Sequence, residues 1–105
     1  MIAVIFEAEP KSGRAADYFE TAAALRESVE RVEGFVSIER FESVTRPGKY
    51  LSLSFWRDED AVRRWREDAS HRAAQELGRA HLFANYRIRV ATVIRDYGQD
   101  KTGGV

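Results

Sequence analysis

The sequence predicts an α+β fold in which a four-stranded antiparallel sheet carries its helices on one face. Apolar segments with the composition of strands alternate with segments whose apolar residues recur at helical spacing, in the order strand, helix, strand, strand, helix, strand. A proline–glycine turn joins the two middle strands into a hairpin. This order is that of a split β-α-β arrangement, and 105 residues are the usual size of one domain.

The first strand is expected at Ile2–Ala8, an apolar run rich in β-branched residues that Pro10 ends. A helix is expected over Ala15–Val32, because apolar residues recur there at three- and four-residue steps. Its stripe consists of Phe19, Ala22, Leu25 or Arg26, Val29 and Val32. Gly34 follows as the left-handed residue that ends many helices.

The two middle strands are expected at Phe35–Thr45 and Tyr50–Arg57, with RPGK between them suited to a type II turn. The stretch YLSLSFWR alternates strictly, so its leucines and its serines face opposite sides of the sheet. We expect the leucine side to face the helices. The expected helix-facing set is Val36, Ile38, Leu51, Leu53, Phe55, Ile88 and Val90, against Phe19, Leu25, Val29 and Leu77 on the helices.

A second helix is expected to begin at Asp58–Asp60, where acidic residues meet the positive end of the helix dipole. We expect an interruption near Asp68–Ser70, and the last strand at Asn85–Tyr97. The inward residues are Val62, Trp65, Ala69, Ala73, Leu77 and Ala80. The elements together predict one ferredoxin-like βαββαβ domain over residues 1–98, followed by a flexible tail at 99–105.

The sheet face away from the helices is expected to carry exposed aromatic residues. Its expected members are Phe35, Ser37, Glu39, Phe41, Ser52, Ser54, Trp56, Arg87, Arg89 and Ala91. Soluble monomers rarely expose such an aromatic patch. We therefore expect a homodimer in which two open sheet faces stack, forming a dimeric α+β barrel.

Composition excludes several classes of partner. Seventeen basic and seventeen acidic residues leave no net charge, so we expect neither nucleic acid nor a membrane as partner. The absence of cysteine excludes thiolate metal sites and fits a cytoplasmic location. MIAVIFEAEP has no basic region and contains Glu7, so neither a signal peptide nor a membrane span is expected there.

Four stretches carry a resemblance to a known family: GFVSIERFES (34–43), LSLSFWRDEDAVRRWRED (51–68), HRAAQ (71–75) and YRIRVATVIRDYG (86–98). They resemble the antibiotic biosynthesis monooxygenase (ABM) domain of the dimeric α+β barrel superfamily. The resemblance implies a dimer with facing sheets and a ligand cavity between each sheet and the ends of its helices. Enzymes of this family oxidise aromatic polyketides to quinones with oxygen, and without flavin, haem or metal.

The resemblance implies a cofactor-independent monooxygenase acting on a small aromatic or quinol-like compound, with no cofactor. The alternative is a dimer of the same fold that binds a small molecule without catalysis. A related branch that degrades haem is similar to this chain only at Trp65. It carries an asparagine on the first strand, absent here, and a histidine where Gln75 stands. Haem degradation is therefore not expected, because the axial ligand is missing.

Three residues are the catalytic candidates. Trp65 aligns with a recurring family tryptophan and would orient an aromatic ligand, or would only fill the apolar stripe. His71 would remove a phenolic proton near neutral pH, or would be a surface residue at a helix end. Arg89 would stabilise the resulting anion. No metal site is expected, because His81 lies ten residues after His71, off the same helical face.

The candidate substrate-binding residues are Trp56, Phe35, Phe41, Arg87 and Phe83, with Phe6 and Tyr86 as further lining candidates. For the aromatic residues of the strands, packing in the dimer interface is the alternative. For Arg87 and Arg89, the alternative is ion pairing across the sheet with Glu39 or Glu42.

Overall fold

The structure is a computed structural model that describes residues 1–99, with the backbone alone at residues 79 and 80. The strands are β1 (Ile2–Pro10), β2 (Phe35–Glu42), β3 (Tyr50–Trp56) and β4 (Phe83–Thr92). The helices are α1 (Ala15–Glu30), α2 (Glu59–Glu67) and α3 (Ala69–Leu77), and the π-helical turn η1 (Gly78–Leu82) leads from α3 into β4.

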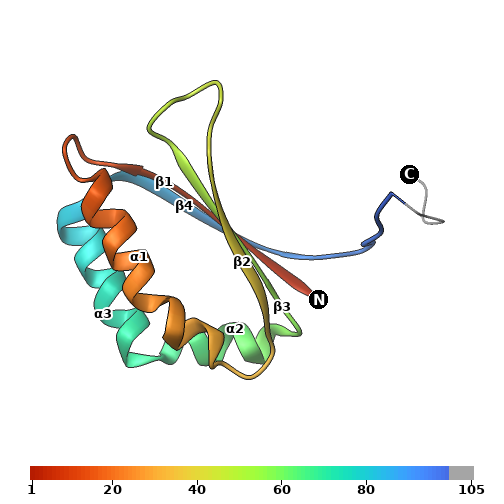
Figure 1. The fold of residues 1–105 in the computed structure, drawn as a ribbon. Coiled ribbons are helices and arrows are strands. Elements are labelled where there is room, and N and C mark those ends of the chain that lie inside the picture. Colours follow the sequence, from red (N-terminus) through yellow and green to blue (C-terminus); the bar gives the residue numbers. More distant parts are fainter. Residues whose placement is uncertain (100–105) are drawn as a thin grey trace.

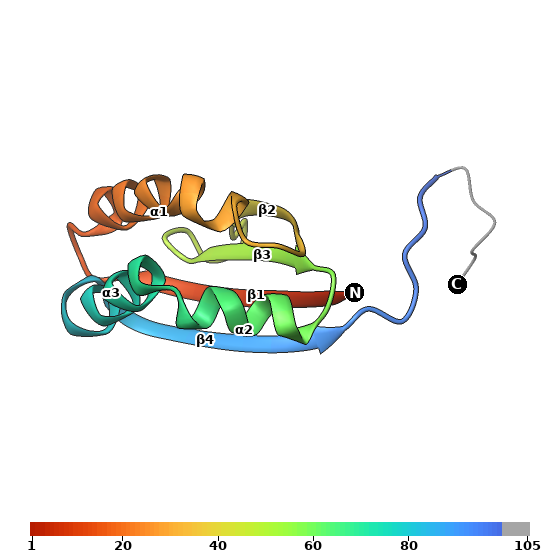
Figure 2. The same cartoon turned by 90° about the horizontal axis from the view of Figure 1, so that it is seen from below.

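The four strands form one antiparallel sheet in the order β2-β3-β1-β4. All helices cover the same face of this sheet, and the other face is left open (Figures 1 and 2). The predicted α+β, ferredoxin-like fold is confirmed. For the described residues, no helix has the length and apolarity needed to cross a membrane.

Two glycines permit the turns that the sequence predicted. Gly34 has φ +92°, and the Arg57 N–H donates to its carbonyl at 2.7 Å, which ties the α1–β2 turn to the end of β3. In the hairpin, Gly48 has φ +91° and the Lys49 N–H donates to the Arg46 carbonyl at 3.1 Å, as in a type II turn.

The predicted interruption of the second helix is confirmed and has a clear cause. Asp68 has extended backbone angles, and its carboxylate accepts hydrogen bonds from the N–H groups of Ser70 at 2.9 Å and His71 at 3.2 Å. It therefore ends α2 and caps α3. Asp58 caps α2 in the same way, accepting from the Ala61 N–H at 2.9 Å.

The prediction for the two faces of β3 is wrong. Trp56, only 1% exposed, faces the helices and forms the core with Ile2, Val29, Ala61 and Val62. Because side chains alternate along a strand, Leu51, Leu53 and Phe55 lie on the open face instead. The indole N–H explains this choice, since it donates to Ser54 Oγ at 2.9 Å on the same face and is thereby satisfied.

A bulge moves the start of β2 by one residue. The register with β3 shifts between Phe35 and Ser37, so Val36 has no place in the core and is 54% exposed. Phe35 instead packs edge-on against Trp56, with ring centroids 5.3 Å apart. The predictions that placed Val36 toward the helices and Phe35 on the open face are therefore wrong.

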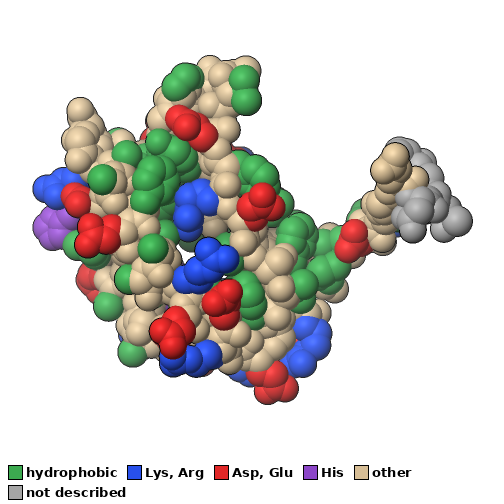
Figure 3. Space-filling model, viewed as in Figure 1, with side chains coloured by type: hydrophobic (Ala, Val, Ile, Leu, Met, Phe, Trp, Pro, Cys, Tyr) green, Lys and Arg blue, Asp and Glu red, His purple; other side chains and the backbone are tan. Residues whose placement is uncertain are grey.

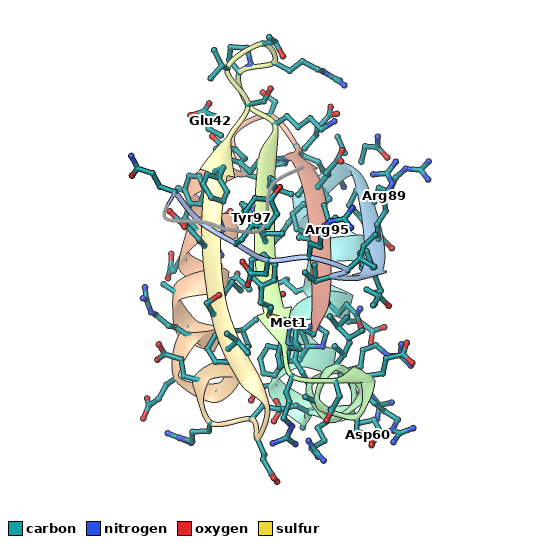
Figure 4. The ribbon with its side chains drawn as sticks, turned by 90° about the vertical axis from the view of Figure 1, so that its right-hand side faces the viewer. Met1, Glu42, Asp60, Arg89, Arg95 and Tyr97 are labelled. Carbon is teal, nitrogen blue, oxygen red and sulfur yellow. The ribbon has the colours of Figure 1, made fainter. Side chains whose placement is uncertain are left out.

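The last strand occupies Phe83–Thr92, not Asn85–Tyr97 as predicted. Its pairing with β1 ends at Thr92 opposite Ile2, followed by one hydrogen bond from the Val93 N–H to the Met1 carbonyl at 3.0 Å. Residues 93–99 then run away from the sheet on its open side (Figures 1 and 4). Apart from Gln99, the predicted tail at 99–105 lies outside the described residues.

Replacing Gly34 with alanine is expected to destabilise the domain by about 2–4 kcal/mol. The new Cβ would lie 2.6 Å from the Cβ of the fully buried Ala61, and alanine is strained at a φ of +92°. Gly48→Ala is the matched control, because it has the same φ and nothing within 4 Å of the new Cβ, and should lose about 1–2 kcal/mol. Equal losses of unfolding free energy in the two variants, measured by urea denaturation, would contradict the close contact between residue 34 and Ala61.

Candidate functional site

A cavity of about 520 Å³ lies between the sheet and the helices. Most of its lining is apolar or aromatic, with a few polar side chains, as in many small-molecule sites. In Figure 3 the hollow between the helices and the sheet has basic side chains at its rim, and the basic lining residues are Arg26, Arg40 and Arg66.

The sheet supplies the floor of this cavity in levels that follow the strand register. One level combines Ile38, Ser54, Val4 and Val90, and the next combines Arg40, Ser52, Phe6 and Ile88. Each level joins all four strands, and its side chains point to the helix side. The floor is thus apolar on β1 and β4 and carries its polar groups on β2 and β3.

Trp65 and His71 form the wall on the α2–α3 side. Their ring centroids lie 4.6 Å apart with an interplanar angle of 36°. Trp65 comes from the last turn of α2, while the Asp68 cap fixes His71 in the first turn of α3. Both residues line the cavity, so the break between the two helices is what brings the indole and the imidazole into contact.

The His71 imidazole has an unsatisfied nitrogen. Its Nδ1 atom is buried and has no hydrogen-bond partner among the described residues. Burial lowers the pKa of His71 from its ordinary value of 6.5, and the Arg66 backbone and the Asp68 carboxylate oppose this shift only in part. The imidazole is therefore neutral at pH 7. A neutral ring at a cavity wall can accept a proton or a hydrogen bond from a ligand.

Other predicted residues gather around the same space. Trp56 and Phe83 line the cavity, Phe35 supports Trp56 from behind, and Phe6 and Tyr86 also contribute lining. Phe6 and Phe83 pack edge-on at 5.5 Å.

Three of the predicted site residues lie on the opposite face of the sheet. Arg87, Arg89 and Phe41 pair across the strands with Glu7, Ile5 and Leu51, which belong to the open face. Arg89 lies on this face in Figure 4, and its Nη1 contacts Glu7 Oε2 at 3.1 Å. Within one chain, Arg89 is therefore separated by the sheet from Trp65 and His71.

Glu7 is the centre of this ion-pair group on the open face. Lys49 Nζ lies 2.9 Å from Glu7 Oε1, and the hydrogen bond and charge of Lys49 lower the pKa of Glu7, with a smaller effect from Arg89. Ion pairing of Arg89 was the alternative considered from the sequence, with Glu39 or Glu42 as partner. The partner is Glu7 instead, because β4 pairs with β1 and not with β2.

Sequence reasoning missed Arg40 and Tyr18. Arg40 Nε donates to the Tyr18 hydroxyl at 3.2 Å, and both residues line the cavity. The signal was available, because Arg40 stands two residues after Ile38, which was expected to face the helices. Among the described residues, no group of three or more histidine, cysteine, aspartate or glutamate side chains is arranged to hold a metal ion.

A family model and two known proteins match most of this chain in sequence. A family model described as antibiotic biosynthesis monooxygenase matches residues 1–77. The chain is 44% identical over 93 residues to jasmonate monooxygenase ABM of Pyricularia oryzae, covering 89% of this chain and 43% of that protein. It thus spans less than half the length of that relative. It is also 34% identical over 93 residues to the uncharacterized protein YqjZ of Bacillus subtilis, covering 89% of this chain and 79% of that protein.

Solved structures share the fold at lower identity. SnoaB, a cofactor-independent oxygenase from Streptomyces nogalater, matches with a TM-score of 0.80 and 17% identity, over 93% of this chain and 97% of that chain. Rv0793 from Mycobacterium tuberculosis matches with a TM-score of 0.82 and 15% identity, over 92% and 98%.

The buried position of His71 predicts a specific pH dependence. The folded protein keeps the imidazole neutral to a lower pH than the unfolded chain does, so the unfolded chain binds more protons below 6.5. The free energy of unfolding should therefore fall as the pH is lowered through this range, and less so in His71→Gln. NMR titration of an H81Q variant, which leaves one histidine signal, should give a pKa below 6.5 for His71. A value at or above 6.5 would contradict the burial of this ring.

Proposed function

This chain belongs to the antibiotic biosynthesis monooxygenase family, and from that premise we propose that it is a cofactor-independent monooxygenase. Its substrate would be a small aromatic or quinol-like compound held in the cavity between the sheet and the helices. The observation that carries the proposal is the unpartnered Nδ1 of His71, buried at the cavity wall against Trp65.

The proposed chemistry relies on the substrate for its electrons. Neutral His71 removes a proton from the bound ring, and the electron-rich anion that remains reduces O₂ directly. At a ring carbon that carries two hydrogens, one atom of O₂ becomes the carbonyl oxygen of the product. The other atom of O₂ takes both hydrogens and leaves as water. Trp65 holds the ring flat against the floor, to which Trp56 belongs, and Phe83 limits its position at the far end.

The named relatives support the reaction class more than the substrate. By its name, jasmonate monooxygenase ABM acts on jasmonate, and SnoaB is named as a cofactor-independent oxygenase. Oxygenation is common to both names. The aromatic or quinol-like nature of the substrate therefore remains our proposal.

We also propose a cytoplasmic homodimer that stacks two open sheet faces. Phe41 is 42% exposed on this face, beside the half-buried Leu51, Leu53 and Phe55. Residues 93–99 extend from the same side, with Ile94 87% exposed. A second copy would cover both apolar surfaces. Arg89 would then act on a ligand only from this face, and a role for Arg89 or Arg87 in anion binding stays a prediction.

The second candidate is a dimer that binds a small molecule without catalysis. One observation favours it: Arg89, the expected stabiliser of the anion, is paired with Glu7 across the sheet from His71. If the reaction needs Arg89 beside the ring, the same cavity would bind an aromatic ligand and leave it unchanged.

Oxygen uptake separates the two candidates. Hydroxylated naphthalenes and quinols that raise the melting temperature should also consume O₂, and His71→Gln should lower kcat by a factor on the order of 100 to 10,000 with little change in binding. His81→Gln is the matched control and should keep full activity, because His81 is exposed and outside the cavity lining. Binding without oxygen uptake in the wild type would favour the non-catalytic candidate.

The dimer is tested by light scattering. Phe41→Glu should convert the dimer to a monomer, because it places a charge on the apolar part of the stacked faces. Ala24→Glu, on the exposed side of α1 away from the open face, should remain dimeric. A monomeric wild-type protein at micromolar concentration would contradict the proposed assembly.

A further inference from the structure

We propose that the cavity binds its ligand through a carboxylate, which Arg40, Tyr18 and Ser52 hold at one side while the apolar body lies along the floor. The substrate class would then be an aromatic or cyclic carboxylic acid. This inference rests on the proposed function for the location of the site, and it adds the group that orients the substrate there.

Arg40 is the first observation, because a charged side chain is unusual on the concave face of this sheet. It lies on the cavity floor in one level with Ser52, Phe6 and Ile88. A guanidinium next to apolar side chains loses part of its hydration. This loss costs free energy unless a hydrogen-bond partner replaces the water. Arg40 is an exposed residue that also lines the cavity, so it lies at the rim of the cavity and not at its deepest point.

The second observation is the set of partners that Arg40 has. Its Nε donates to the Tyr18 hydroxyl at 3.2 Å, and its Cζ lies 5.4 Å from the centre of the Tyr18 ring. Tyr18 is only 5% exposed, so it holds the guanidinium in place. Among the described residues, no carboxylate lies within 4.0 Å of Arg40, although seven other arginines have such a partner.

These contacts leave a fork of donors directed at a ligand. With Nε engaged, the two terminal nitrogens of Arg40 still offer four N–H groups, in the geometry that matches the two oxygens of a carboxylate. The Tyr18 oxygen accepts from Nε, which leaves its own O–H free to donate. Ser52 lies opposite Arg40 in the strand register. Its hydroxyl is the third donor, after the Arg40 guanidinium and the Tyr18 hydroxyl.

A single guanidinium at this side of the cavity suits a ligand with one carboxylate. Of the other lining arginines, Arg26 has Glu30 as its partner at 3.7 Å, and Arg66 belongs to α2, on the side of the cavity that Trp65 and His71 form. Arg40 is thus the cation that the Tyr18 hydroxyl holds next to Ser52. With the carboxylate at Arg40, the body of the ligand extends over the apolar floor toward Trp65 and His71.

Binding of 6-hydroxy-2-naphthoate and of its methyl ester, measured by calorimetry without oxygen, tests the inference. The wild type should bind the acid more tightly than the ester by a factor on the order of 10 to 100, as expected for charge-assisted hydrogen bonds. Arg40→Gln should remove most of this preference while changing ester binding by less than about threefold. Arg40→Lys should keep part of the preference, because it retains the charge and loses the fork.

Arg26→Gln is the matched control, since it removes a lining arginine that already has a carboxylate partner, and it should keep the preference for the acid. Equal affinity of the wild type for acid and ester, failure of the acid to bind at millimolar concentration, or an equal loss for both ligands in Arg40→Gln would each overturn the inference. These outcomes are distinct from failure of the proposed function, because binding without oxygen involves no turnover. Oxygen uptake with neutral quinols could persist after the carboxylate preference had failed.

Discussion

Trp56 fills the centre of the core and donates its indole N–H to Ser54 Oγ at 2.9 Å, and this pairing sets which face of β3 lies against the helices. A buried indole needs a hydrogen-bond partner, and a serine two residues earlier on the same strand face supplies it without help from another element. The leucines of β3 are consequently placed on the open face. One internal pairing thus leaves polar groups on the cavity floor and apolar groups on the surface that needs a second layer.

The chemistry available in the cavity follows from two polar groups that the fold places at its walls. Asp68 breaks the second helical segment and holds His71 against Trp65, so a neutral imidazole with a buried, unpartnered Nδ1 lies in the wall of an aromatic-lined cavity. Across the floor, Tyr18 holds Arg40. A base on one wall and a cation on another would fix both the position and the direction of an acidic ligand, which is the main requirement when the substrate supplies its own electrons.

The sequence was sufficient for the fold and for part of the site. Periodicity, Gly34, RPGK and the acidic start of α2 predicted the elements, because each signal is local in the chain. The faces of β3 could not be read in this way, since hydropathy favours the leucine side, whereas the structure buries Trp56 in the core and satisfies its indole N–H at Ser54. The bulge at Val36 likewise reversed the predicted places of two residues, because Phe35 packs against Trp56 and Val36 is exposed. Arg40 was missed because the cation for the ligand was sought among the arginines of the last strand, although Ile38, two residues before Arg40, was expected to face the helices.

The central claim is that ligand binds on the helix side of the sheet, beside Trp65 and His71. A crystal structure of the protein with 6-hydroxy-2-naphthoate, whose hydroxyl and carboxylate lie at opposite ends of the ring system, tests this most directly, because the helix face and the open face are separated by the full thickness of the sheet. The account predicts the naphthalene ring in the cavity, with its hydroxyl within hydrogen-bond distance of His71 Nδ1. A ligand bound on the open face beside Arg89 and Phe41, with His71 Nδ1 still unpartnered, would contradict it.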